Sequence, residues 1–417
     1  MEIKKKVTTK EVRGIVAMLD DIIKEYKEEH PEKERNWRTY EQRVAERLKT
    51  AFKELKPLVH EAAASIQFVS GETRGTKPVL NAEQRTLAVL VKHIVGKSNR
   101  NMASMFVLFS LLSNIDVSYK TVERFYSDPE VIAVLHNLHA LILRKKGVKE
   151  IDGSGDGTGY SLTIKAHYAS AAQKLKEKVK DTNTQSKEHK KTLFIYSFAL
   201  MDIKTRMYVG FGTSFKSEKK AYLFAIVMAK EAGIKINSLR LDRYFSGQST
   251  TEFLAGNFRD IKVFLIPKSN ATVRDSWPWK RMLFRFVNGT TEYLEEYFQR
   301  NQSESGIAED KKRTGWRLGQ KRPDRVDTAN MLTHVWHNLY WLGCFQFILS
   351  HTRLKVIIVA VATQVHIRNN PALQHLGQKV SLSGRPNQFV LHASLKIVLW
   401  DHQNQYDAVV HRVPCVS

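Results

Sequence analysis

The chain has 417 residues, 42% of them hydrophobic and 26% charged, which is enough apolar material for packed domains and excludes a wholly disordered protein. Its 66 lysines and arginines outnumber its 42 aspartates and glutamates, and the formal net charge of +24 favours a polyanionic partner such as nucleic acid. The two cysteines exclude a disulfide framework, no apolar run is long enough to span a bilayer, and we expect a soluble intracellular protein without a signal peptide.

Residues 1–68 predict a charged, helical N-terminal region. Leu19 and Ile22 recur at helical spacing among alternating acidic and basic residues, and a second apolar series runs over residues 48–58. Both series are typical of helices with one apolar side and a large exposed polar surface. The glycines and the proline that follow, in residues 69–81, indicate a loop or linker.

Residues 82–145 predict a second helical region with more apolar residues. Its first helix carries five of them on one face: Leu87, Leu90, Val91, Ile94 and Val95. A turn leads into another apolar helix over 105–112, and Ser118 is placed as the N-cap of a short helix over 119–126. This order of helix, turn and short polar-faced helix is typical of a helix-turn-helix module.

DNA reading is one of two interpretations of this second region. In a helix-turn-helix, Lys120 and Arg124 would face a DNA groove. A plain helical bundle fits the sequence equally well, because the helix-turn-helix has no strict residue code. We predict an all-helical N-terminal DNA-binding region, with the bundle as the alternative.

Between residues 148 and 345 the pattern changes to strands that alternate with helices. The predicted order is a strand at 148–151 that enters a glycine-rich turn, strands at 193–200 and 207–212, a helix around 221–228, a strand at 236–241, a helix at 248–257 and a strand at 263–267. This order favours an α/β domain with a mixed sheet. The lysine-rich residues 169–191 predict a loop insert, and residues 346–417 form a C-terminal region of unclear fold.

Three acidic residues of this domain are candidates for a metal site. Asp156 lies in the glycine-rich segment, Asp242 follows the strand at 236–241, and Glu304 lies in a later helix. Magnesium prefers hard oxygen ligands, and carboxylates from two strands and one helix can hold two such ions across a scissile phosphate. The sequence therefore predicts metal-dependent phosphoryl chemistry at these residues.

Four polar side chains share one face of the predicted helix that carries Glu304. At 100° per residue, Tyr297, Arg300, Glu304 and Lys311 fall within about 60° of one another. The arginine and the lysine would hold flanking phosphates, the arginine through two parallel hydrogen bonds. Gly306 lowers the helix propensity of this run, and we expect the helix to bend there.

The spacing Tyr297-x2-Arg300-x3-Glu304-x6-Lys311 resembles, without a gap, the Tyr-Arg-Glu-Lys signature of one large group of DDE transposases from prokaryotic insertion sequences. The first aspartate of that family lies in a short glycine-containing turn, and the segment around Asp156 is similar to it. The second aspartate of the family ends a strand, as is expected here.

This resemblance implies a ribonuclease-H-like, mixed-sheet catalytic domain over residues 148–345. The triad that it implies for catalysis and metal binding is Asp156, Asp242 and Glu304. Two Mg²⁺ (or Mn²⁺) ions would bind in each active site, and the other three residues of the signature would place the DNA end. The stretch between the second aspartate and the glutamate is too short for the large β-rich insertion that some relatives carry, so cleavage through a hairpin, as in those relatives, is in doubt.

The implied activity is that of a transposase. It would bind the terminal inverted repeats of its own mobile element, cut the DNA at both ends and join the 3′-hydroxyls to target DNA, as a homodimer on DNA in the prokaryotic cytoplasm, associated with the nucleoid. Two other classes stay open. One is a ribonuclease-H-like nuclease or resolvase that cuts without joining, and the other is a catalytically silent DNA-binding protein derived from a transposase.

The first aspartate of the triad has a competitor in the sequence. Asp152-Gly153-Ser154-Gly155 and Asp156-Gly157-Thr158-Gly159 are similar units in tandem. On an extended strand Asp152 and Asp156 would share a face about 13 Å apart, too far to bind the same metal pair. We favour Asp156, whose following residues fit the family turn better, and interpret Asp152 as a loop carboxylate or a partner of the ligands.

Aromatic and histidine pairs outside these motifs have a structural and a functional interpretation. Trp277 and Trp279 lie beside basic residues and would suit the stacking of an unpaired base, although tryptophan pairs more often pack in a core. The histidine pairs His136/His139 and His334/His337 are expected to pack between helices, because no further histidine or cysteine lies near them in the sequence.

Overall fold

The computed structural model describes residues 6–31, 36–66, 80–95, 107, 117–161, 194–274, 276–320, 322–343, 396–400 and 406–410. The predicted linker, the apolar helix at 105–112 and the lysine-rich insert lie wholly or almost wholly outside these residues. Of the C-terminal region, the structure describes a two-stranded antiparallel sheet of β6 (Lys396–Trp400) and β7 (Tyr406–Val410).

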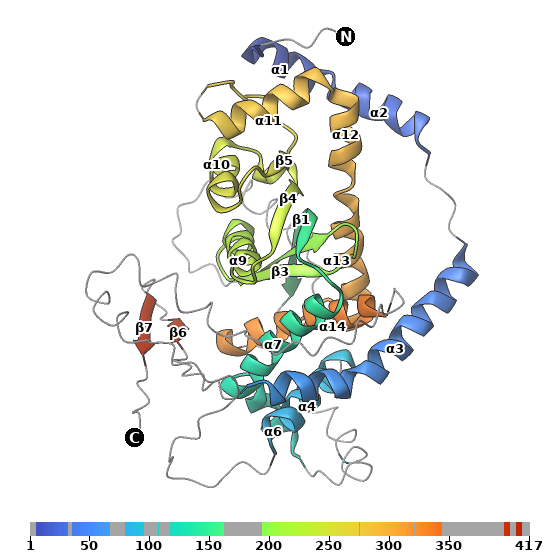
Figure 1. Cartoon of the computed structure of the whole chain (residues 1–417), viewed down its shortest axis with the longest axis vertical. Coiled ribbons are helices and arrows are strands. Elements are labelled where there is room, and N and C mark those ends of the chain that lie inside the picture. Colours follow the sequence, from blue (N-terminus) through green and yellow to red (C-terminus); the bar gives the residue numbers. More distant parts are fainter. Residues whose placement is uncertain are drawn as a thin grey trace, which may run out of the picture.

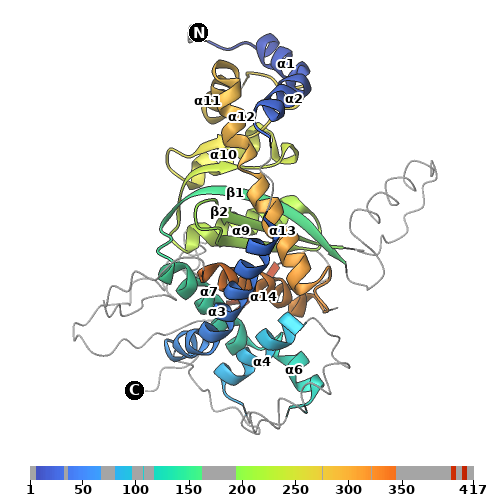
Figure 2. The same ribbon diagram turned by 90° about the vertical axis from the view of Figure 1, so that its right-hand side faces the viewer.

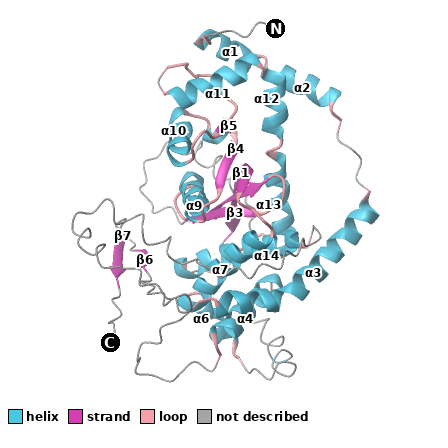
Figure 3. Cartoon of the chain, viewed as in Figure 1, coloured by secondary structure: helices cyan, strands magenta, loops and turns pink. Residues whose placement is uncertain are grey.

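A five-stranded mixed sheet forms the centre of the molecule (Figure 3). Its strands are β1 (Glu150–Ser161), β2 (Phe194–Asp202), β3 (Tyr208–Ser214), β4 (Lys235–Arg240) and β5 (Lys262–Phe264). The spatial order is β3-β2-β1-β4-β5, with β1 antiparallel to β2 and parallel to β4. The predicted mixed α/β sheet is confirmed, and it is consistent with a ribonuclease-H-like domain.

The glycine-rich segment after residue 151 is a strand, so the prediction of a turn there is wrong. β1 continues without interruption to Ser161 and pairs with β2 from Gly153 onward. Its glycines are needed for close packing: a Cβ atom on Gly155 would lie 2.6 Å from the ring of Phe198 and 2.8 Å from Leu241. The absence of side chains at these positions lets large neighbours pack against the strand.

Helices cover both faces of the sheet (Figures 1 and 2). The helices of this domain are α9 (Glu218–Glu231), α10 (Gln248–Asn257), α11 (Trp277–Asn288), α12 (Thr290–Phe298), α13 (Asn301–Thr314) and α14 (Pro323–Leu342). Gly210 and Gly212 of β3 approach the backbone of α9, whereas Phe211 stacks on His334 of α14. Because side chains alternate along a strand, α9 and α14 lie on opposite faces.

The N-terminal helices pack on this domain at two separate places (Figure 1). They are α1 (Thr9–Ala17), α2 (Leu19–Glu29), α3 (Trp37–Ala64), α4 (Ala82–Val95), α6 (Tyr119–Phe125) and α7 (Pro129–Lys145). Near α11, Arg13 of α1 donates to the carbonyl of Ala271 at 3.1 Å, whereas α3, α4 and α7 pack against α14. The helical region and the sheet therefore share one hydrophobic core.

The buried face of α4 differs from the apolar face predicted for it. Leu90 is buried, but Leu87 and Val91 are only half-buried, and polar side chains fill the interior instead. Buried Arg85 pairs with Asp128, at the N-cap of α7, and with Glu130. Polar residues take the inward face because the rest of the molecule supplies their partners, which hydrophobic periodicity cannot reveal.

A set of buried histidines joins α4, α7 and α14 to the sheet. His93 contacts the hydroxyl of Thr333 at 2.9 Å, and His337 contacts Asp310 at 2.8 Å. Although burial opposes its charge, His337 holds the pKa of Asp310 below its usual value. The prediction that the two histidine pairs pack between helices is confirmed for His139, His334 and His337, which are buried in hydrogen-bonded positions. It is wrong for His136, whose side chain is exposed on α7.

We expect this histidine set to make the fold sensitive to acid. Burial lowers the pKa of His93, His139 and His334 to about 3 each. Below about pH 6.5 these histidines take up protons in the unfolded chain but not in the folded chain. The free energy of unfolding therefore decreases as the pH is lowered, by up to about 1.4 kcal/mol per pH unit for each histidine. Urea unfolding at pH 7.5 and pH 5.5 measures this slope. His93→Gln should flatten it and His30→Gln, at an exposed histidine, should not; equal stability at both pH values would contradict the account.

Candidate active site

Two neighbouring strands bring the two predicted aspartates together. β1 and β4 run parallel, and their pairing ends at Ser154 and Arg240. Asp156 and Asp242 each follow this last pair by two residues, so the register places them at the same level of the sheet. Asp242 then begins a short 3-10 helix and accepts a hydrogen bond from the amide of Arg243 at 2.6 Å.

The third predicted carboxylate reaches this place from α13. One Nη atom of Arg300 lies 2.7 Å from Glu304 and 3.9 Å from Asp156, so a single guanidinium bridges strand and helix. Ser154 and Ser303 hold the two elements close, with their hydroxyls 2.7 Å apart. The structure thus brings Asp156, Asp242, Arg300 and Glu304 into one cluster.

The helix that carries the Tyr-Arg-Glu-Lys spacing breaks at Arg300, and the predicted bend at Gly306 is wrong. α12 ends at Phe298 and α13 begins at Asn301, whereas Gly306 lies inside a regular helix. A Cβ atom at Gly306 would lie 2.3 Å from Met201 of β2. The glycine is therefore needed for the close contact between α13 and the sheet.

The cluster changes the ionisation of its members. Burial raises the pKa of Asp156 to about 7, partly opposed by the charge of Arg300. Burial opposes the charge of Arg300 as well, but Tyr297, Glu304 and Asp242 raise its pKa. Burial also raises the pKa of Tyr297. These mutual effects show that the side chains lie close enough to act on one another.

Lys311 lies near the C-terminal end of α13, beyond Glu304 on the helix. It donates to the hydroxyl of Thr158, two residues after Asp156, and burial lowers its pKa to about 8. Its ammonium group also lies 4.8 Å from the ring centre of Trp316, whose side chain is 49% exposed. Trp316 is outside every motif recognised in the sequence, and only the fold places it beside the signature lysine.

Asp152 has a different environment from Asp156. Its carboxylate accepts a hydrogen bond from Ser238 on β4, so it lies in the sheet and not in a loop. The same hydroxyl is 2.5 Å from a guanidinium nitrogen of buried Arg240, whose Nε donates to the carbonyl of Glu296 on α12. Asp152 therefore belongs to a chain of contacts that ties β1 and β4 to the helix before Arg300.

The donor set of the cluster fits a divalent cation by its chemistry, because Asp156, Asp242 and Glu304 offer hard oxygen atoms. In the part of the chain that the structure describes, no three acidic, histidine or cysteine side chains lie close enough together to hold a metal ion as they stand. The guanidinium of Arg300 lies between two of these carboxylates. The positive charge of Arg300 therefore partly offsets the negative charges of these carboxylates.

A further carboxylate, absent from all the motifs, lies at this cluster. Glu218 is the first residue of α9, and its side chain contacts Gly157 of β1. The negative charge of Asp242 acts on it, and burial together with that charge raises the pKa of Glu218. No spacing rule could have selected it, because its approach to β1 depends on how α9 crosses the sheet.

The residues predicted to contact DNA outside the cluster have unequal exposure. Lys120 and Arg124 are exposed on α6, whose predicted N-cap Ser118 is confirmed. Trp277 is 68% exposed, but Trp279 is buried and its indole nitrogen donates to the carbonyl of Thr272 at 2.8 Å. Base stacking on Trp279 is therefore excluded, because its ring belongs to the core.

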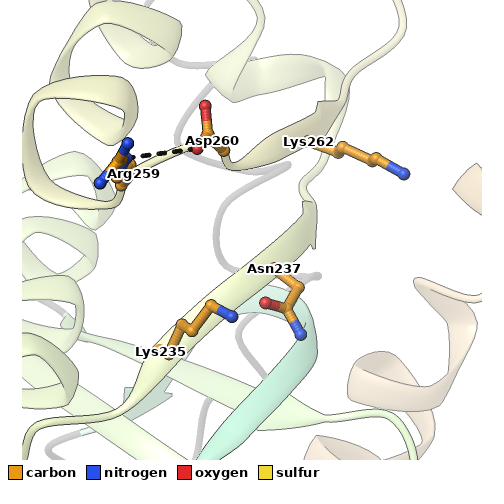
Figure 4. A pocket seen from close by; sticks show the side chains of 5 residues that line it. All are labelled: Lys235, Asn237, Arg259, Asp260 and Lys262. Carbon is orange, nitrogen blue, oxygen red and sulfur yellow. Dashed lines mark ion pairs between the residues drawn. The ribbon is translucent and has the colours of Figure 1, made fainter.

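A surface cavity of about 380 Å³ lies elsewhere on the sheet (Figure 4). It is lined by Lys235, Asn237, Arg259, Asp260 and Lys262. Lys235 is the first residue of β4, so the cavity lies at the opposite end of that strand from Asp242. Because it holds one carboxylate, which is paired with Arg259 at 3.5 Å, it offers no comparable donor set.

Comparison with known proteins identifies the family. No protein-family model matches the chain. It is 40% identical over 335 residues to the probable transposase for insertion sequence element ISA1214 of Archaeoglobus fulgidus, a match that covers 80% of this chain and 97% of that protein. The chain belongs to the family of insertion-sequence transposases.

The match extends over the site of this transposase-family chain. A continuous stretch of 335 residues in a chain of 417 must include residues 83–335, which carry every member of the cluster. Between Asp242 and Glu304 the transposase holds α10, β5, α11 and α12, with no β-rich insertion in the described residues. In the described regions, no helix is long and apolar enough to cross a membrane.

Proposed function

We propose that this chain is a DDE transposase that binds the terminal inverted repeats of its mobile element, cleaves the DNA there and joins the 3′-ends to target DNA. The observation that carries the proposal is the meeting of Asp156, Asp242 and Glu304 around Arg300, in a chain of the insertion-sequence transposase family. A ribonuclease-H-like fold of the catalytic domain is part of the proposal.

Asp156, Asp242 and Glu304 would hold two Mg²⁺ or Mn²⁺ ions, as their oxygen donors allow. When bound, such a pair polarises the scissile phosphate and lowers the pKa of an attacking water or 3′-hydroxyl. The chain contributes a half-buried setting in which charges interact more strongly than in water. It also fixes the spacing of the carboxylates, through the pairing of β1 with β4 and the close contact of α13 with β1.

The other signature residues would place the DNA end. Arg300 presents a planar guanidinium that suits two parallel hydrogen bonds to a phosphate, and its contact with Glu304 fixes its orientation. Lys311 is anchored by Thr158 and adds a second positive charge along the same face. Tyr297 is buried and lies against Arg300, with the guanidinium carbon 5.6 Å from its ring centre. We infer that it positions the arginine.

End recognition would reside in the helical region, where we expect Lys120 and Arg124 to contact phosphates. Either alanine variant should weaken binding to the terminal repeats and reduce the salt dependence of binding by about one unit of slope. Fluorescence anisotropy with end DNA at several salt concentrations measures both. Lys53→Ala, at an exposed lysine of α3, is the control for simple loss of charge. Unchanged affinity in Lys120→Ala and Arg124→Ala would show that α6 does not contact DNA.

Incubation of the purified chain with Mg²⁺ and DNA that carries the element's inverted repeats tests the function. We expect cuts at the element boundary that leave 3′-hydroxyls, and none in DNA with scrambled ends. Both ends must be joined in one event, so we propose a homodimer on DNA. A nuclease or resolvase would cut without joining, and a silent DNA-binding derivative would bind without cutting.

A further inference from the structure

Glu218 reaches the cluster from the side of the sheet opposite to α13. Asp156 points toward α13, where Arg300 lies, so the next residue, Gly157, faces α9. A Cβ atom on Gly157 would lie 2.1 Å from Oε1 of Glu218 and 2.4 Å from its Cδ. The missing side chain of Gly157 therefore provides the space in which the Glu218 carboxylate lies.

Beside these residues β1 and β4 are no longer paired, so side chains from both faces of the sheet can approach one another. Pairing between β1 and β4 ends at Ser154 and Arg240, so beyond that pair no strand hydrogen bonds separate β1 from Asp242. The register places Asp242 just beyond this last pair, at the level of Asp156. The charges of the carboxylates act on one another, since Glu218 contributes to the raised pKa of Asp156 and Asp242 to that of Glu218.

Glu218 has no hydrogen-bond or ion-pair partner within the described segments of the chain. A half-buried carboxylate without a partner loses hydration and gains nothing in exchange, which is unfavourable unless a cation binds there. Among the described residues, the positive charge of Arg300 acts on Asp156, and the charge of Asp156 in turn acts on Lys311. When fully ionised, Arg300 and Lys311 leave the four carboxylates with a net charge of −2.

We propose that Glu218 is a fourth carboxylate ligand of the metal site, beside Asp156, Asp242 and Glu304. This inference rests on the proposed function and extends its three-carboxylate site. The fourth oxygen donor comes from α9, so the metal site joins both helical layers where the pairing of β1 with β4 ends. One divalent ion would neutralise the cluster, and a second would give it the positive charge that a DNA phosphate requires.

Metal binding without DNA separates this proposal from the proposed function. Electron paramagnetic resonance of free Mn²⁺ in a titration of the full chain gives the affinity, and circular dichroism shows that each variant is folded. We expect Glu218→Gln to weaken Mn²⁺ binding about tenfold or more, and we expect the same of Asp242→Asn. Glu231→Gln is the matched control, because Glu231 is a half-buried carboxylate at the other end of α9 and should bind Mn²⁺ like the wild type.

The outcomes of this titration are distinct. Wild-type affinity in Glu218→Gln, with binding lost in Asp242→Asn, overturns the role of Glu218 and leaves the three-carboxylate site intact. Wild-type affinity in both variants overturns the metal site of the proposed function together with this proposal. An equal loss in Glu231→Gln also overturns it, because the effect would then come from the charge of the helix and not from one ligand.

A second pair of variants tests the contact with Gly157. Gly157→Ala places a methyl group where the Glu218 side chain lies, so it should weaken Mn²⁺ binding in the same way. In a chain that already carries Glu218→Ala, the same glycine change should have no further effect, since the two residues act through one contact. Additive losses in the double variant would show that Gly157 acts independently and would contradict the proposed placement.

Discussion

Asp242→Asn and Glu304→Gln are each expected to reduce DNA cleavage at the element ends by about 10³-fold or more while end binding is retained. Each change removes a charged oxygen donor, and the loss of metal-dependent stabilisation of the transition state amounts to roughly 4 kcal/mol. We expect DNA binding to depend mainly on the net charge of +24, which these changes do not lower. Single-turnover cleavage of labelled end DNA, together with anisotropy for binding, measures both quantities.

The control for the glutamate lies on the same helix. Glu309 of α13 is half-buried and lies 3.9 Å from Arg313, away from the aspartates, so Glu309→Gln should cut at nearly the wild-type rate. Cleavage within threefold of wild type in Glu304→Gln would contradict the assignment. A parallel loss of DNA binding in that variant would show that it perturbs the fold instead of the chemistry.

The second large effect separates the two tandem aspartates. Asp156→Ala should abolish cleavage as the other triad changes do, because its carboxylate faces Arg300 and Glu304. Asp152→Ala should retain activity to within about tenfold and lower the free energy of unfolding by about 1–3 kcal/mol, since it removes a partner of Ser238. Parallel measurements of cleavage rate and of urea unfolding distinguish a lost ligand from a lost structural contact.

The opposite result for these two variants would be equally clear. An inactive Asp152→Ala with an active Asp156→Ala would make Asp152 the ligand and would require β1 to shift by four residues against α13. Full activity in both would remove the first carboxylate from the mechanism altogether. Ser238→Ala is a useful companion, because it removes the same hydrogen bond from the other strand and should resemble Asp152→Ala.

The sequence predicted the elements of the catalytic domain better than their packing. Apolar strands and capped helices are local patterns, so β2, β3, β4, α9 and α10 appear close to where they were expected. β1 was misread because alternating glycines are typical of turns. Their actual role, to admit Phe198 and Glu218 against the strand, depends on neighbours that are far away in the chain.

In the candidate site, too, local features could be predicted and long-range contacts could not. Helical spacing alone predicted that Arg300 and Glu304 share a face, and the structure confirms their contact. The break of the helix at Arg300, the buried environment of Lys311 and the arrival of Glu218 from α9 all depend on tertiary packing. Local periodicity carries no information on such contacts, so sequence reasoning could not find them.

The most direct test of the central claim is the joining reaction itself. A pre-cut, labelled inverted-repeat end with a free 3′-hydroxyl is incubated with the chain, Mg²⁺ and a supercoiled target plasmid, and covalent transfer of the label is measured on a denaturing gel. The account predicts label in the plasmid with the wild type, none without the divalent ion and none with Glu304→Gln. End binding without any transfer by the wild type, or transfer that persists in Glu304→Gln, would contradict it.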